Sequence, residues 1–227
     1  MTARAVAVRR DPGTGAGLGR RAVALVLVLL VPLTVGLLGT LAPLHPVIGW
    51  LCSYSPQRLF RGELWTLPLS GVIQARPRTL GPYTLVSLGV MTPYILGFGI
   101  ARPLRAYIAG HVIATLAAAV VIGLGAALGW HEASVLFHTC DAGVSAGMAA
   151  AGGGLAVALM RTQWRPLAII VVAALLYLFT ERIAAENATR ALADGEHLVA
   201  LVTGAFVERT WGTWGRPARG LLRIAET

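Results

Sequence analysis

The sequence predicts an all-α, polytopic membrane protein, a bundle of about six transmembrane helices that form a single membrane domain. Two properties of its composition lead to this fold class: 56% of the 227 residues are hydrophobic, and only 13% are charged. The third observation is that the apolar residues gather in runs near the length of about 20 residues that a helix needs to cross a bilayer. Lipid is therefore the expected surrounding of most side chains.

The apolar runs define the membrane domain, residues 22–211, and the tails beside it. A basic tail, residues 1–21, precedes the first run, which is long enough at about 20 residues to span and to be retained. A long outer loop, residues 42–80, precedes the second run, and its stretch 64–75 is too short and too interrupted by proline to cross. A second basic tail, residues 212–227, ends the chain. The predicted spans are residues 22–41, 81–101, 104–129, 142–160, 166–183 and the shorter 195–210.

Arginine placement predicts the orientation, because basic residues in short loops stay on the cytoplasmic side. All 19 basic residues are Arg. Thirteen of them precede span one, follow span six, or lie in the loops between spans two and three and between spans four and five. The long outer loop has four, where they carry little topological weight, and the loop between spans five and six has two that are balanced by acidic residues. The loop between spans three and four has none. We therefore expect a multi-pass protein in the plasma membrane, with both termini in the cytoplasm. The use of Arg alone as the basic residue, with abundant Ala and Gly, is typical of a GC-rich bacterial genome.

The net charge of +9 predicts contact with anionic lipid headgroups. Binding to nucleic acid is not predicted, because the sequence has no basic stripe, zinc finger or aromatic RNA-binding motif. Small residues concentrate in span four, from Gly143 to Gly154. Such residues let helix backbones approach closely, so this helix is expected at the centre of the bundle. A transporter or channel subunit is a weaker interpretation, because the chain has no internal repeat and few charges within its spans.

Two polar side chains stand near the outer ends of spans four and six. Asp141 and Asp194 are the expected N-caps of these helices, which places Ser145 and His197 about 5 Å below the helix starts. A neutral imidazole at the same depth would activate the serine hydroxyl, and the neighbouring glycines would admit a substrate backbone. The alternative is that Ser145 bonds its own helix and His197 is a polar residue near the interface.

Several segments together resemble the rhomboid family over roughly residues 60 to 210. They are Gly143-x-Ser145 at the outer start of span four, Gly195-Glu-His197 with Gly204 in span six, Arg61-Gly-Glu-Leu-Trp-Thr66 and Tyr94-Ile-Leu-Gly97. The resemblance implies an intramembrane serine endopeptidase, a serine protease and hydrolase, that cleaves transmembrane substrates near their outer end. Ser145 would be the nucleophile and His197 the base, with no third acid. Gly143, Gly147 and Gly204 would support them, and neither a metal nor an organic cofactor is implied.

The sequence also departs from the rhomboid pattern. Ala146 follows the serine where rhomboids usually have Gly, Glu196 precedes the histidine, and Ala200 replaces a Gly. Tyr83 and Ser87 fall near the places of the family's oxyanion donors. These departures favour an alternative, a catalytically inactive rhomboid-fold protein that binds membrane-protein clients, whereas the retained Ser145 and His197 favour the protease.

Three further residues have roles left open by the sequence. Cys52 in the outer loop and Cys140 before span four are the only cysteines, and on the oxidising side they would form a disulfide if they approach closely. Glu196 would either orient His197 or lie exposed at headgroup level.

Overall fold

The structure is a computed structural model that describes residues 19, 22, 23, 26, 45–73, 77–141, 144–180 and 188–211. Within these residues the fold is all-α, as predicted, and the extended backbone is limited to an isolated bridge between Tyr54 and Asp141. The helices are α2 (His45–Cys52), α3 (Pro56–Phe60), α4 (Thr66–Ser70), α5 (Pro77–Phe98), α6 (Ala101–Ala127), α7 (His131–His138), α8 (Ser145–Met160), α9 (Arg165–Thr180) and α10 (Ala188–Trp211).

Five of these helices, α5, α6, α8, α9 and α10, coincide with predicted spans two to six. The first predicted span, 22–41, lies outside the described residues apart from three positions. By length and apolar character, α6 is the described helix that could cross a membrane, and the apolar parts of α5, α8 and α9 are shorter. The last helix starts at Ala188, earlier than the predicted 195, because its polar first turns continue the helix.

Both N-cap predictions are wrong. Asp194 lies inside α10 and is buried, since that helix begins six residues before it. The N-cap of α8 is Val144, which makes no side-chain capping bond. Asp141 instead exchanges two backbone hydrogen bonds with Tyr54, at 2.8 and 2.7 Å.

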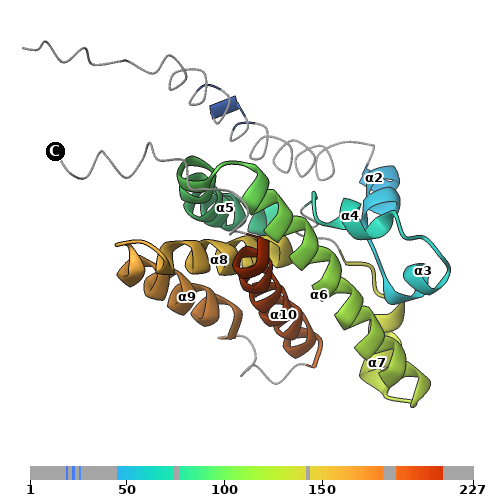
Figure 1. The fold of residues 1–227 in the computed structure, drawn as a ribbon. Helices are drawn as coiled ribbons and strands as arrows, with labels where there is room; N and C mark the ends of the chain where they lie inside the picture. The colour runs from blue at the N-terminus through green and yellow to red at the C-terminus, as the bar shows by residue number, and fades with distance from the viewer. Residues whose placement is uncertain are drawn as a thin grey trace, which may run out of the picture.

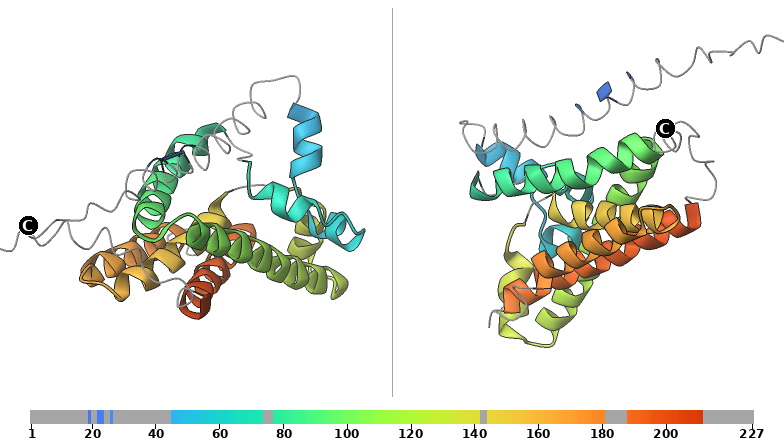
Figure 2. Two further views of the ribbon diagram at one scale, coloured as in Figure 1. Left: turned by 45° about the horizontal axis from the view of Figure 1, so that its top comes forward. Right: turned by 90° about the vertical axis from the view of Figure 1, so that its left-hand side faces the viewer.

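The centre of the bundle is α8, which confirms the prediction from its small residues. Thirteen of its 16 residues are buried, and it contacts α5, α6, α9 and α10. In Figure 1 α6 crosses the view diagonally, with α2, α3 and α4 to one side and α8, α9 and α10 to the other. Figure 2 shows α8, α9 and α10 running alongside one another. A helix buried on every face has no polar stripe, and the small side chains of α8 meet this condition.

Glycines let the backbones of α8 and α10 touch. A Cβ atom at Gly204 would overlap the carbonyl oxygen of Ala150, and one at Gly153 would overlap the carbonyl oxygen of Leu201. A side chain at either position would therefore push against main chain, which cannot rotate aside. This backbone contact fixes how the two helices lie along each other.

The direction of α8 and α10 follows from their contacts with α6. Near the start of α6, Arg102 pairs with Glu208 close to the end of α10. Gly110 lies against both Ala150 of α8 and Ala200 of α10. Because α6 runs antiparallel to both helices, α8 and α10 run parallel to each other.

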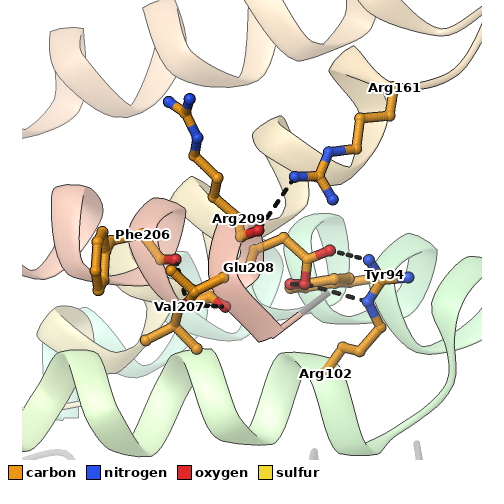
Figure 3. A network of polar contacts seen from close by, with 8 residues as sticks. Tyr94, Arg102, Arg161, Phe206, Val207, Glu208 and Arg209 are labelled. Atoms are coloured by element: carbon orange, nitrogen blue, oxygen red, sulfur yellow. Dashed lines mark hydrogen bonds and ion pairs between the residues drawn. The ribbon is translucent and has the colours of Figure 1, made fainter. Parts of the chain in front are cut away.

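Buried polar contacts close the arginine-rich end of the bundle (Figure 3). The Tyr94 hydroxyl donates to Glu208 Oε2 at 2.7 Å, and the Arg102 guanidinium pairs with the same carboxylate. Arg161, after α8, donates to the carbonyl oxygen of Arg209 at 3.4 Å. The ends of α8 and α10 therefore lie side by side.

The loop that contains α2, α3 and α4 is docked onto the same bundle. His111 of α6 contacts Ser70 Oγ at 3.1 Å and the carbonyl oxygen of Leu67 at 2.9 Å through Nε2. The Tyr107 hydroxyl donates to the carbonyl oxygen of Gly71 at 2.5 Å. The predicted embedded stretch 64–75 therefore includes a short helix, α4, held against the middle of α6.

The close contact of α8 and α10 predicts that Gly204→Ala lowers the free energy of unfolding by about 1–3 kcal/mol, because the new methyl group overlaps the Ala150 backbone. Gly195→Ala on the same helix is the control. Nothing lies within 4 Å of its added Cβ, and alanine favours a helix by about 1 kcal/mol over glycine. Thermal unfolding of the purified variants, followed by circular dichroism, measures both. Equal changes in the free energy of unfolding for the two variants would contradict the close contact of the α8 and α10 backbones.

Candidate functional site

Contacts with α6 relate the positions of Ser145 and His197. Thr115 of α6 donates a 2.8 Å hydrogen bond to Glu196, the residue before His197. The neighbouring Ala114 belongs to the same buried cluster as Ala146, the residue after Ser145. The parallel helices α8 and α10 therefore bring the serine and the histidine toward the same end of α6. The sequence derived a shared depth from the N-caps Asp141 and Asp194, and the observed helix starts, Ser145 and Ala188, do not support that derivation.

The two residues differ in their surroundings. Ser145 is the first residue of α8 and is half-buried. The His197 side chain is 13% exposed, and it lies on the α10 face that continues to Leu201 and Gly204, which pack on α8. Among the described residues, no hydrogen bond joins the Ser145 hydroxyl to the His197 ring. Catalytic hydrogen bonds often shorten only when substrate binds, so this spacing is compatible with a Ser and His pair.

The outer loop reaches this same end. The bridge between Tyr54 and Asp141 ties the loop to the chain entering α8. Burial raises the pKa of the Tyr54 phenol well above its ordinary value, and the negative charges of Glu196 and Asp141 raise it further. Tyr54 is therefore a neutral group that both carboxylates approach. Sequence reasoning missed Tyr54 and Thr115, because neither belongs to a local motif and only the folded chain brings them here.

Of the two roles predicted for Glu196, the exposed position at headgroup level is wrong. Its carboxylate accepts the Thr115 hydrogen bond and is directed to α6. Adjacent residues on a helix point about 100° apart, so Glu196 contacts α6 while His197 lies on a different face. Glu196 therefore anchors the histidine helix, and this bond gives no sign that it orients the imidazole.

The supporting glycines are packing positions in this structure. A Cβ atom at Gly147 would overlap the ring of Tyr107, whose hydroxyl holds the backbone of Gly71. The space beside Gly147 is thus filled by an aromatic ring, and the expectation that it admits a substrate backbone is wrong. Gly204 meets the backbone of Ala150. Gly143 lies outside the described residues.

The oxyanion candidates lie on α5. Ser87 is half-buried, and Val86 beside it packs on the cluster that contains Val144, the residue before Ser145. Ser87 is therefore on a helix that approaches the serine at the same end. Tyr83 also belongs to α5, but its side chain is outside the described part.

The disulfide left open by the sequence is not formed, because Cys52 and Cys140 are both free thiols. The antiparallel bridge pairs Tyr54 with Asp141, a register that brings Cys140 opposite Ser55 and not opposite Cys52. Burial raises the pKa of the Cys52 thiol, whereas Cys140 is exposed.

A cavity of about 390 Å³ opens beside Cys140, between the outer loop and α7. Ser145 and His197 are not among its lining residues, which include Trp50, Arg58 and His138. In the part of the chain that the structure describes, no group of three or more His, Cys, Asp or Glu side chains is placed to hold a metal ion.

In comparisons with known proteins, no family model, no curated protein and no solved structure matches the chain.

The hydrogen bond at the site predicts that Thr115→Val lowers the free energy of unfolding by about 1–3 kcal/mol, because the isosteric change leaves the Glu196 carboxylate without its donor. Thr203→Val is the matched control, since its hydroxyl bonds only the backbone of its own helix at an exposed position. We expect the free energy of unfolding of Thr203→Val to lie within about 0.5 kcal/mol of the wild-type value. Chemical or thermal unfolding measures the difference, and a neutral Thr115→Val would contradict the role of this bond.

Proposed function

We propose that the protein is a rhomboid-like intramembrane serine endopeptidase in which Ser145 and His197 form the catalytic pair. The observation that carries the proposal is the parallel packing of α8 and α10, because it puts a serine and a histidine from distant parts of the sequence toward the same end of the bundle. The matching motifs of the sequence support the same assignment. Ser145 begins a central buried helix, and a rigid helical setting favours precise orientation of a nucleophile.

The chemistry needs only protein groups and water. The His197 imidazole takes the proton of the Ser145 hydroxyl as its oxygen attacks the carbonyl carbon of the scissile peptide. The same proton passes to the leaving amine when the C–N bond breaks. Water then donates a proton to the imidazole, its oxygen attacks the acyl carbon, and Ser145 leaves with that proton. The Ser87 hydroxyl is the candidate donor to the oxyanion, a role whose loss costs a factor of about 10² to 10³ in rate.

The proposed setting is a cell membrane that six helices cross, with both termini in the cytoplasm and the chain surrounded by lipid. It is supported by the polarity of the bundle. Arg102, Arg161 and Arg209 gather at one end of α6, α8 and α10, whereas Tyr54 of the outer loop, Ser145 and His197 lie toward the other. The proposed substrate is a transmembrane helix that is cleaved near its outer end.

A second candidate is a rhomboid-fold protein that binds membrane-protein clients without cleaving them. One observation favours it: among the described residues the Ser145 hydroxyl is not hydrogen-bonded to His197. The ring of Tyr107 beside Gly147 also reduces the free space next to the serine. Both candidate functions use the same fold. They differ in that the peptidase requires an activated Ser145 and the client-binding protein does not.

A fluorophosphonate probe reacts with an activated serine and tests the pair directly. We expect labelling of the wild-type protein in detergent micelles and its loss in Ser145→Ala and His197→Ala. Ser134→Ala and His131→Ala on α7 are the matched controls and should be labelled like the wild type. If the folded wild type takes up no probe, the client-binding function replaces the peptidase.

The two cysteines test the orientation. A membrane-impermeant maleimide should label the wild type in intact cells, and Cys140 should react faster than Cys52, because its thiol is exposed and that of Cys52 has a raised pKa. Gln163→Cys, in a variant without the two native cysteines, should react only after the membrane is permeabilised. Its labelling in intact cells would contradict the proposed topology.

A further inference from the structure

A second acidic residue stands next to the candidate base. Asp194 lies one turn before His197 on α10, and its Oδ1 is 3.9 Å from His197 Nδ1. Both side chains are withdrawn from solvent, with 4% of the aspartate and 13% of the histidine side chain exposed. The separation is an ion-pair distance, about 1 Å longer than a hydrogen bond, and a small rotation of either side chain closes it.

The nitrogen that faces the carboxylate decides how the ring can react. A carboxylate at Nδ1 holds the proton on that nitrogen and leaves Nε2 as the atom that accepts a proton from a hydroxyl. A buried negative charge also stabilises the imidazolium that forms when the ring takes the serine proton, since little water competes with it. A triad uses its acid in these two ways.

Other titratable groups surround this end of the bundle. Glu196 shares the helix but is engaged by Thr115 of α6. Asp141 lies ahead of α8 and is bridged to Tyr54 of the outer loop. His111 of α6 contacts Ser70, and α7, which contacts α10, carries the exposed Glu132. Asp194 is the acidic residue whose carboxylate faces the ring, because it lies one turn before His197 on the same helix and its Oδ1 is 3.9 Å from Nδ1.

We infer that Asp194 is the positioning residue of the site: it holds the His197 ring through Nδ1, turns Nε2 toward Ser145, and stabilises the imidazolium formed in the reaction. The inference rests on the proposed serine peptidase and adds a buried acid to it, where the rhomboid resemblance implies none.

The state of the ring is measured by ¹⁵N NMR of histidine-labelled protein in micelles, a readout that needs no activity. The chain has 5 histidines, and His197→Gln identifies the signal. We expect the neutral wild-type ring to carry its proton on Nδ1, and Asp194→Asn to shift it toward the Nε2–H form. Glu196→Gln, the neighbouring carboxylate, is the matched control and should leave the wild-type form in place.

A second readout is the pH profile of fluorophosphonate labelling. Asp194→Asn should slow labelling about tenfold or more and move the midpoint of the profile to lower pH by about one unit, whereas Glu196→Gln should leave the midpoint unchanged. A purely structural aspartate would reduce the folded fraction without moving the midpoint.

The outcomes separate the two proposals. A wild-type ring with its proton on Nε2 overturns the role of Asp194, and this result does not depend on whether Asp194→Asn folds. The Nδ1–H form in a wild type that takes up no probe would leave the Asp194 and His197 pair standing and refute the peptidase.

Discussion

The contact between the backbones of α8 and α10 is the constraint on which the rest of the structure depends. At Gly153 and Gly204 there is no side chain between the two helices, so main chain lies on main chain. Such contacts have almost no freedom to slide, because any displacement drives carbonyl oxygens into the opposite backbone. The position of Ser145 relative to His197 is therefore set about two turns away from either residue. The same feature explains why α8 is built from alanine and glycine.

Two buried polar contacts bracket this apolar centre. At the arginine-rich end, Glu208 accepts from Tyr94 and pairs with Arg102, which links α5, α6 and α10. At the other end, Thr115 donates to Glu196 and links α6 to α10 again. Apolar packing alone specifies a helix register poorly, whereas a buried carboxylate must meet its donor. The two contacts therefore fix the rotation and register of α10, and with them the face on which His197 lies.

The end that carries Ser145 is unusually rich in interacting polar groups for a bundle with an apolar core. The outer loop supplies Tyr54, the chain before α8 supplies Asp141, and α10 supplies Asp194, Glu196 and His197. The opposite end satisfies its charges by pairing them. The Ser145 end instead gathers carboxylates around a histidine and a serine, an arrangement suited to proton transfer. This contrast between the two ends of the bundle favours the Ser145 end as the candidate functional site.

The sequence by itself determined the all-α class, the helices at five of the predicted spans, and the central place of the small-residue helix. These follow from patterns along one helix at a time, namely apolar length and small-residue content. Only the tertiary structure decided that the Tyr107 ring fills the space beside Gly147, that Glu196 bonds to Thr115, and that Cys52 and Cys140 are not joined. The physical reason is that each of these outcomes depends on the rotation of one helix or loop against another. Hydropathy along the chain does not contain that rotation, because it arises from the packing of side chains that are distant in the sequence.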